Sequence, residues 1–420
     1  MNRAIINADE PIAPGMLPPA QRGPGQPLRV LFIGHRALGF RTTSSLLETH
    51  AGERADIDAV HWYPTRTFAQ RLLAAPTPLS RWNLDMHKLR SQSAAGRAVA
   101  RRLVPGGIEL SRFDVVHVLT QQMGAFLPGL GGRSTCRWFV QADATMPLYQ
   151  RWFDDSSTLA GPSMRLERAV FAAADAVACW SAWTLESVRD ELGIAPEKLF
   201  LYRPCPRGAS ANVRAESSGK LRIVFVGNDW QRKGGPRLLR WHQQRWISRA
   251  ELHVCSASAP ADPKLKDVVW HGPTPHEKLV GQILPNMHVM AMPTTLDTFV
   301  IAVAEGQIAG LPVVASRLSG LQELVRDGVS GFLCDRHDDD GFIRAIERMI
   351  DDPQLRHRLA AGARAHAARN LNSDVWHRHL FDQFHRVAAG RSPILAPESV
   401  DPQALGLTVP ANEQRSESHR

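Results

Sequence analysis

The chain has 420 residues, of which 44% are hydrophobic, and its formal net charge is +9 at pH 7. This length allows a large buried core and is typical of two or three domains. The sequence has no run of about 18 apolar residues, so we expect no membrane-spanning helix, and its start lacks the apolar core of a signal peptide. The positive charge favours anionic partners, which include nucleic acid, lipid head groups and phosphorylated small molecules.

The five cysteines are an odd number, and none belongs to a Cys-x-x-Cys pair. This pattern fits neither a disulfide framework nor a zinc site, and it is typical of reduced thiols in the cytosol. We therefore expect a cytoplasmic protein, with a peripheral position on the inner face of the membrane as an alternative.

The first predicted domain follows an arm over residues 1–27, which is rich in Pro and Gly and is expected to be disordered. From Leu28 onward, short apolar runs alternate with helical patterns, which is typical of βαβ units and a parallel sheet. We expect an N-terminal, acceptor-side Rossmann-like domain over residues 28–206. Its predicted strands cover residues 28–34, 57–62, 114–119, 137–141 and 176–181.

A second α/β pattern begins after residues 207–220, a small and polar segment that we interpret as a linker. We expect a second domain over residues 221–372 and a disordered tail over residues 391–420. The predicted strands of the second domain cover residues 221–227, 252–254, 268–270, 289–292 and 312–316. The expected fold class is α/β, with two doubly wound Rossmann-like domains that face each other across a cleft at their strand ends.

The segment over residues 293–331 carries the most chemical information. Thr298 is placed to cap a helix from about residue 299 to residue 309. Asp297 precedes that helix, where either a negative charge or a bound phosphate is favoured. Glu305 lies eight positions later in an otherwise small and apolar run, where a carboxylate needs partners. The two acids are at most about 12 Å apart along the helix axis, so they suit two parts of one extended ligand.

These residues resemble the donor-binding segment of family 4 (group 1) glycosyltransferases, which are retaining enzymes of GT-B fold. Asp297, Phe299, Glu305 and the strand over residues 310–316 match the family pattern of two acids eight positions apart. The resemblance implies that Glu305 holds the ribose hydroxyls, and that Asp297 and the following backbone N–H groups, at Phe299 and Val300, face the donor sugar and distal phosphate. It extends loosely over residues 28–390. It also implies that residues 373–390 form a helix that crosses back to the first domain.

A loop after the first strand of the second domain, residues 227–235, provides the second motif. Lys233-Gly234 matches the Lys-Gly pair of the family, while Asn228 stands where the family has Arg. Arg232 is a substitute for that missing cation. The resemblance implies that Arg232 and Lys233 bind the donor diphosphate, and two cations there offset its charge without a metal.

The chain departs from the family pattern at several positions. Asp297 is one methylene shorter than the usual Glu, and Val300 replaces a glycine. The first-domain strand that usually ends in a His has none, so we expect Asp143 or Gln141 to take its place. Gly39 lies in a loop that lacks the usual paired glycines, and we expect it to let a phosphate approach.

The resulting expectation is a retaining, metal-independent, hexosyl-type glycosyltransferase. It would move a sugar from a nucleotide-diphosphate-sugar, its co-substrate, to a glycan, lipid-linked or small-molecule acceptor, as in polysaccharide biosynthesis, and would need no cofactor. Asp297 and Asp143 are the catalytic candidates. Two alternatives remain: a non-catalytic nucleotide-sugar-binding or scaffold protein of the same fold, and a UDP-sugar epimerase.

Each candidate residue also has a purely structural interpretation. Asp297 could serve only the helix terminus, Glu305 could pair with a buried Arg, and Asp143 could be a turn residue. Arg232 and Lys233 could belong to a solvated loop.

A basic segment over residues 86–108 contains Lys88, Arg90, Arg97, Arg101 and Arg102 and no acid. Leu89, Val99 and Leu103 could give it an apolar side. The segment is either a solvated face or a surface that rests on anionic lipid. We expect no nucleic-acid partner, because the chain shows no reading module and no array of aromatic and basic residues.

Overall fold

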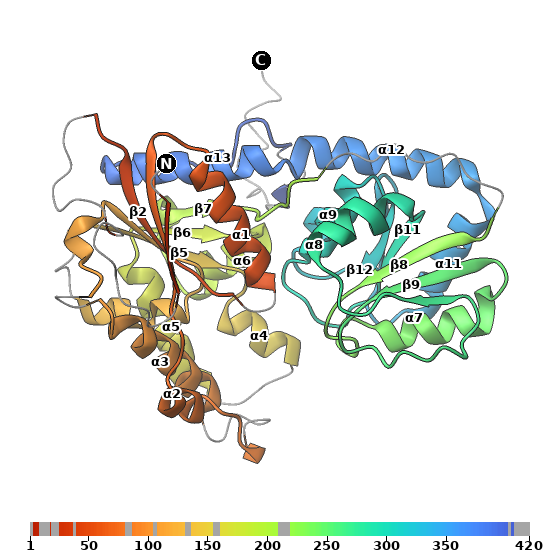
Figure 1. Cartoon of the computed structure of the whole chain (residues 1–420), viewed down its shortest axis with the longest axis horizontal. Coiled ribbons are helices and arrows are strands. Elements are labelled where there is room, and N and C mark those ends of the chain that lie inside the picture. The colour runs from red at the N-terminus through yellow and green to blue at the C-terminus, as the bar shows by residue number, and fades with distance from the viewer. Residues whose placement is uncertain are drawn as a thin grey trace, which may run out of the picture. The chain divides into compact units, whose positions relative to one another are not determined.

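The computed structural model describes residues 3–7, 17, 25–36, 39–79, 86–103, 107–130, 136–153, 160–208, 219–401 and 405–406. The chain forms two compact units (Figure 1). Unit 1 comprises residues 1–180, 187–207 and 372–397, and unit 2 comprises residues 181–186, 208–371 and 398–420. Most of the predicted linker, residues 209–218, lies outside the described residues.

Unit 1 is built on a seven-stranded parallel sheet with the strand order β1-β3-β2-β4-β5-β6-β7. Its inner strands are buried on both faces, which explains why they are apolar throughout rather than alternating. The strands are β1 (Arg3–Asn7), β2 (Leu28–Ile33), β3 (Ile57–Tyr63), β4 (Val115–Val118), β5 (Arg137–Ala142), β6 (Ala176–Cys179) and β7 (Leu199–Leu201).

Helices cover both faces of this sheet, as the doubly wound prediction requires (Figure 1). On one face, α13 packs aromatic rings against the sheet, with Phe384 4.7 Å from Phe139 and 5.9 Å from Phe32 between ring centroids. Figure 1 shows α2 and α3 on the opposite side of the sheet. The helices of unit 1 are α1 (Gly39–Gly52), α2 (Phe68–Leu73), α3 (His87–Ala100), α4 (Met146–Phe153), α5 (Gly161–Ala173) and α13 (Ser373–Ala388).

Two predictions of disorder are wrong for part of their range. Residues 3–7 form β1, which pairs in parallel with β3 and places the fully buried Ile6 beside Trp62. In the predicted tail, residues 391–401 are described, and the N–H of Leu201 donates to the carbonyl of Leu395 at 2.7 Å. β1 is ordered by backbone pairing with the unit 1 sheet, and the tail segment by the Leu395 contact and by the N–H groups of Ile394 and Asp401, which donate to Gln383 and Asn370. Residues 402–404 and 407–420 lie outside the described residues.

Unit 2 contains a six-stranded parallel sheet with the order β10-β9-β8-β11-β12-β13. The strands are β8 (Leu221–Val226), β9 (Ala250–Cys255), β10 (Val268–Trp270), β11 (Val289–Met292), β12 (Val313–Ser316) and β13 (Gly331–Cys334). The helices are α6 (Ala182–Glu186), α7 (Gly235–Trp241), α8 (His276–Lys278), α9 (Ile301–Ile308), α10 (Leu321–Leu324), α11 (Asp339–Asp351) and α12 (Pro353–Asn370). The order reverses between β8 and β11, and such a switch point is where α/β sheets bind ligands.

The basic segment 86–108 differs from its prediction. Its helix α3 buries the face that contains Ala95 and Val99, so Val99 serves the core and not an exposed apolar side. Arg90 donates to the carbonyls of Leu73 and Ala75, which ties α3 to the end of α2. Among the described residues, no helix combines the length and the apolar character needed to cross a bilayer.

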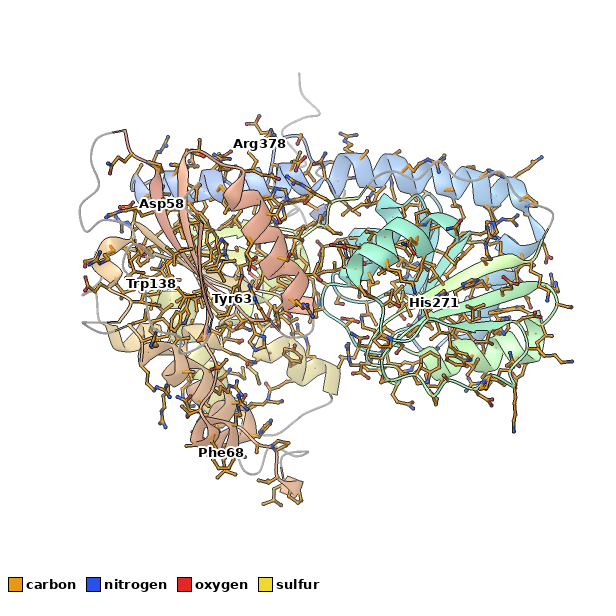
Figure 2. All side chains as sticks on the ribbon, viewed as in Figure 1. Asp58, Tyr63, Phe68, Trp138, His271 and Arg378 are labelled. Atoms are coloured by element: carbon orange, nitrogen blue, oxygen red, sulfur yellow. The ribbon has the colours of Figure 1, made fainter. Side chains whose placement is uncertain are left out.

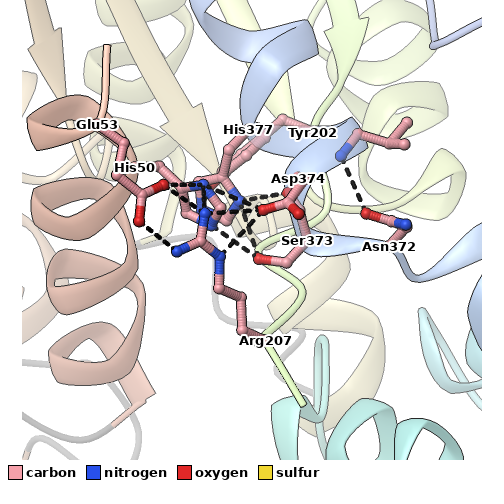
Figure 3. A network of polar contacts seen from close by, with 9 residues as sticks. His50, Glu53, Tyr202, Arg207, Asn372, Ser373, Asp374 and His377 are labelled. Carbon is pink, nitrogen blue, oxygen red and sulfur yellow. Dashed lines mark hydrogen bonds and ion pairs between the residues drawn. The ribbon is translucent and has the colours of Figure 1, made fainter. Parts of the chain in front are cut away.

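A polar network in unit 1, with buried histidines and exposed charged groups, links Arg207 to α13 (Figure 3). The chain leaves unit 1 after Arg207 and returns to it with α13. The Arg207 guanidinium pairs with the carboxylates of Glu53 and Asp374 and lies 3.1 Å from Nδ1 of His50. The His50 ring stacks on His377 at 3.8 Å, and Nε2 of His377 lies 2.9 Å from the Tyr202 hydroxyl. Burial lowers the pKa of His50 to about 4 and the pKa of His377 well below its usual value.

Candidate functional site

The helix that follows Asp297 starts later than the sequence suggests. α9 begins at Ile301, its N-cap is Val300, and Thr298 does not cap it. Phe299 and Val300 are extended instead, because burying both side chains in the core outweighs one additional turn of helix. Their side chains are therefore inside unit 2, and only their backbone remains for a ligand. Asp297 lies several residues before the helix, so the interpretation of Asp297 as a simple helix-terminus acid does not fit.

Asp297 instead pairs with the two cations of the 227–235 loop. Lys233 Nζ lies 2.9 Å and Arg232 Nη1 3.3 Å from Oδ2 of Asp297. Arg232 also pairs with Asp229 through Nε at 2.9 Å. The residual exposure of Asp297 is 9%, so this carboxylate is mostly removed from water and its charge is balanced by neighbours. The structure thus brings Asp297 together with Lys233, which lies 64 positions earlier in the sequence, and with the adjacent Arg232.

Glycines in the 227–235 loop make this approach possible. Gly234 has φ +80°, and a Cβ there would lie 2.0 Å from the carbonyl oxygen of Pro293. A Cβ on Gly227 would lie 2.3 Å from Cδ of Lys233, so the lysine stem runs directly over this glycine. The Lys-Gly pair therefore fixes the direction of the ammonium group, which is more than a solvated loop requires.

Two further loops hold the backbone of this site. The carbonyl of Arg232 accepts from the N–H of Thr295 at 3.0 Å and from the hydroxyls of Thr294 and Thr295. The Ser319 hydroxyl donates to the carbonyl of Asp297 at 2.6 Å, and Ser319 has the unusual φ of +43°. These loops follow the carboxyl ends of β8, β11 and β12, so the cluster lies at the switch point of the sheet.

Glu305 lies on α9 and is 7% exposed. Its Oε1 is 3.0 Å from Nδ1 of His276, the first residue of α8. The hydrogen bond to Glu305 raises the pKa of His276 above its usual value. The partner is thus a titratable histidine rather than a buried Arg. The sequence does not reveal His276 as a site residue, because an isolated histidine in a Pro-rich turn has no pattern that links it to an acid 29 positions away.

Gln141 and Asp143, the two unit 1 residues expected to replace the usual histidine, differ in burial and in contacts. Gln141 is fully buried, and its side chain contacts Nε2 of His117 at 2.8 Å and accepts from Trp180. It is therefore a structural residue and not a replacement for the usual histidine. Asp143 follows β5 and is half-buried, which leaves it as the unit 1 carboxylate candidate. Gly39 is the first residue of α1, where free backbone N–H groups occur.

Glu167 is a buried acid whose charge is influenced by Asp143, and the sequence does not reveal that it titrates unusually. Glu167 accepts from the Met146 N–H at 2.8 Å and from the Gln121 amide at 3.0 Å. Burial, with a contribution from the negative charge of Asp143, raises the pKa of Glu167 to about 7. The environment of Asp143 therefore includes a carboxyl group that changes its charge near neutral pH.

The chain is similar to known glycosyltransferases in sequence and in structure. The family model described as glycosyl transferases group 1 matches residues 220–352. The chain is 29% identical to D-inositol 3-phosphate glycosyltransferase 1 of Catenulispora acidiphila over 61% of this chain and 68% of that protein. It is 28% identical to the D-inositol 3-phosphate glycosyltransferase of Acidothermus cellulolyticus over 71% and 72%. The match to the Streptomyces griseus enzyme of that name is 36% identical and covers 28% of its length.

Solved structures share the fold over most of the chain. Sucrose-phosphate synthase of Thermosynechococcus elongatus superposes with a TM-score of 0.64 at 18% identity, covering 87% of this chain and 100% of that chain. Anabaena HepE in complex with UDP-glucose gives 0.60 at 14% identity, covering 85% and 99%. Residues 220–352, which include Lys233 and Asp297, therefore match the group 1 glycosyl transferases, and the chain shares the GT-B fold of these solved structures with its two Rossmann-like units.

Proposed function

We propose that the chain transfers a sugar from a nucleotide-diphosphate-sugar, with retention and without a metal. The observation that carries this proposal is the convergence of Lys233 and Arg232 on Asp297 at the carboxyl ends of β8 and β11. Two cations fixed by tight loops offer charge-assisted hydrogen bonds to a diphosphate. They would stabilise the negative charge that develops on the leaving diphosphate as its bond to the sugar breaks.

The remaining residues have distinct proposed roles. Glu305, held at Oε1 by His276, would accept from the ribose hydroxyls through its other oxygen. Asp297 would orient Lys233 and face the donor sugar, and backbone N–H groups near Phe299 and Val300 would approach the distal phosphate. Asp143 would take the place of the usual first-domain histidine, and Gly39 would admit a phosphate. No side chain is proposed as a nucleophile and no cofactor is required.

The comparisons supply candidates for donor and acceptor. HepE was solved with UDP-glucose, and the curated relatives are named for D-inositol 3-phosphate. We therefore propose a UDP-sugar as donor and a phosphorylated polyol as the first acceptor to test. Glycan and lipid-linked acceptors, and with them a role in polysaccharide biosynthesis in the cytoplasm, are separate outcomes of the same assay.

Donor binding to the purified protein tests the proposal. UDP-, GDP- and ADP-sugars are compared by thermal shift, and a ligand at a hundredfold excess over its Kd should stabilise the protein by about 2.7 kcal/mol. Glu305→Ala is expected to weaken donor binding at least about tenfold, because a charge-assisted hydrogen bond is lost. Asp340→Ala removes an exposed carboxylate from α11 of the same unit and should leave affinity unchanged. Full donor affinity in Glu305→Ala would contradict the assignment.

The same experiments separate the alternatives. Donor binding without transfer or hydrolysis, across several acceptors, would favour a non-catalytic binding protein, for which the structural role of Gln141 is one argument. Conversion of the donor alone into a new sugar isomer, followed by nuclear magnetic resonance, would favour an epimerase.

A further inference from the structure

Exposed apolar side chains are concentrated in one region of unit 1. Of the eight large hydrophobic residues that are exposed in the described part of the chain, four lie between residues 68 and 86. Phe68 is 83% exposed and Leu72 66%, followed by Leu79 at 49% and Met86 at 38%. Single exposed apolar residues need no explanation, but two large ones that share a helix face mark a candidate interaction site.

The two most exposed residues belong to a well-formed helix. Phe68 and Leu72 are four positions apart on α2 and therefore lie on the same face. The helix is fixed by a capping box in which the Gln70 N–H donates to the Thr67 hydroxyl and the Thr67 N–H donates to the Gln70 side chain. Figure 2 shows Phe68 at the outer end of the α2–α3 pair, away from the sheet. The apolar face is thus presented by folded structure.

The described residues of α2, α3 and their flanks carry charge of a single sign, whereas residues 80–85, outside the described part of the chain, add Arg81 and Asp85 to the sequence. Residues 64–79 and 86–103 contain seven basic residues and no Asp or Glu. The basic residues are Arg66, Arg71, Lys88, Arg90, Arg97, Arg101 and Arg102. Arg66, Arg71 and Arg90 donate to backbone carbonyls, and Arg71, Arg97 and Arg101 are exposed. A projecting apolar face whose charged neighbours in the described segments 64–79 and 86–103 are all cations suits an interface between hydrocarbon and anionic head groups.

Other occupants fit less well. Single-stranded nucleic acid needs several stacking aromatics along a basic groove, and Phe68 is the only aromatic among the exposed large hydrophobics described. A second copy of the chain, docked through the same face, would place its seven basic residues against the same seven, and the like charges would repel each other. We propose that the α2–α3 surface docks on an anionic lipid bilayer, with Phe68 and Leu72 entering the head-group region and Arg71 and Arg97 above it. This proposal does not depend on the donor site.

Vesicle binding by the full-length protein tests the proposal. The wild-type protein should sediment with vesicles of phosphatidylcholine mixed with phosphatidylglycerol, and hardly with phosphatidylcholine alone. High salt should weaken this binding, because it screens the basic residues. Phe68→Ser with Leu72→Ser should reduce the partition coefficient at least about tenfold, since two large apolar side chains no longer enter the bilayer. Arg71→Gln with Arg97→Gln should reduce it about fivefold per cation.

A matched control removes exposed apolar side chains elsewhere. Val269 and Val329 are 38% and 43% exposed in unit 2, and Val269→Ser with Val329→Ser should leave vesicle binding unchanged. Thermal unfolding and donor affinity of each variant verify that the fold and the donor site are intact. The proposal fails if the wild type ignores anionic vesicles at low salt, if the Phe68/Leu72 variant binds them normally, or if charge makes no difference. It also fails if that variant instead abolishes self-association in sizing chromatography.

Discussion

At the scale of single residues, we expect the pair formed by His276 and Glu305 to make the proposed donor binding depend on pH. Glu305 raises the pKa of His276, so the ion pair contributes fully below the ordinary histidine pKa of 6.5 and is lost as the pH rises through the raised value. His276→Ala should therefore weaken donor binding about two- to fivefold at pH 6 and less at pH 8. Donor titrations at both pH values measure this difference. His337→Ala, an exposed histidine in the same unit, should show none.

The sequence could indicate Lys233, Asp297 and Glu305, because the two acids and the Lys-Gly pair occur at recognisable spacings. It could not show that Lys233 pairs with Asp297, since that contact depends on the adjacency of β8 and β11. For Gln141, the sequence suggested a functional role that the three-dimensional contacts do not support. Its position suggested a ligand contact, and only its contacts with His117 and Trp180 reveal a buried structural role.

At the scale of elements, the 227–235 loop and the loop after β11 depend on a close backbone approach at Gly234. Gly234→Ala would require a non-glycine residue at φ +80° with its Cβ 2.0 Å from the Pro293 carbonyl. We expect a loss of about 1–3 kcal/mol in the free energy of unfolding, together with weaker donor binding as Lys233 moves. Denaturant unfolding and donor titration measure both effects.

Gly281→Ala is the matched control for that loop variant. Gly281 lies in a helical segment of the same unit, and a Cβ there meets nothing within 4 Å. Alanine should be neutral or stabilise the protein by up to about 1 kcal/mol. If Gly234→Ala were as stable as Gly281→Ala and bound donor normally, the tight approach would have no role in forming the cation site.

The sequence located most strands well because parallel strands buried on both faces are continuous apolar runs. It misplaced the start of α9, because Thr298 is a good capping residue locally while Phe299 and Val300 are drawn into the core by tertiary packing. It also missed β1, an edge strand whose few residues are ordered by pairing with β3. Both errors concern contacts with residues that are distant in the sequence.

At the scale of the whole molecule, the stability of unit 1 should depend on the histidine network that joins α1 to α13. His50 faces Arg207, Glu53, Asp374, Ser373 and His377, and the last of these also meets Tyr202. The pKa of His50 is lowered to about 4 from 6.5, so the unfolded chain binds more protons than the folded one between these values. Stability is therefore retained above pH 6.5 and lost as the pH falls, by about 3 kcal/mol for His50 alone.

His50→Asn should separate this linkage from general acid effects. The variant should be less stable than wild type at pH 7, because the stacked ring and its contact with Ser373 are lost, but its stability should fall less steeply toward pH 4.5. Hydrogen–deuterium exchange of α1 and α13 amides at several pH values localises the effect to unit 1, which matters because the two units need not unfold together. His337→Asn should retain the wild-type slope. If the stability of His50→Asn depended on pH as steeply as that of the wild type, protonation of His50 would not control the stability of the contacts between α1, Arg207 and α13.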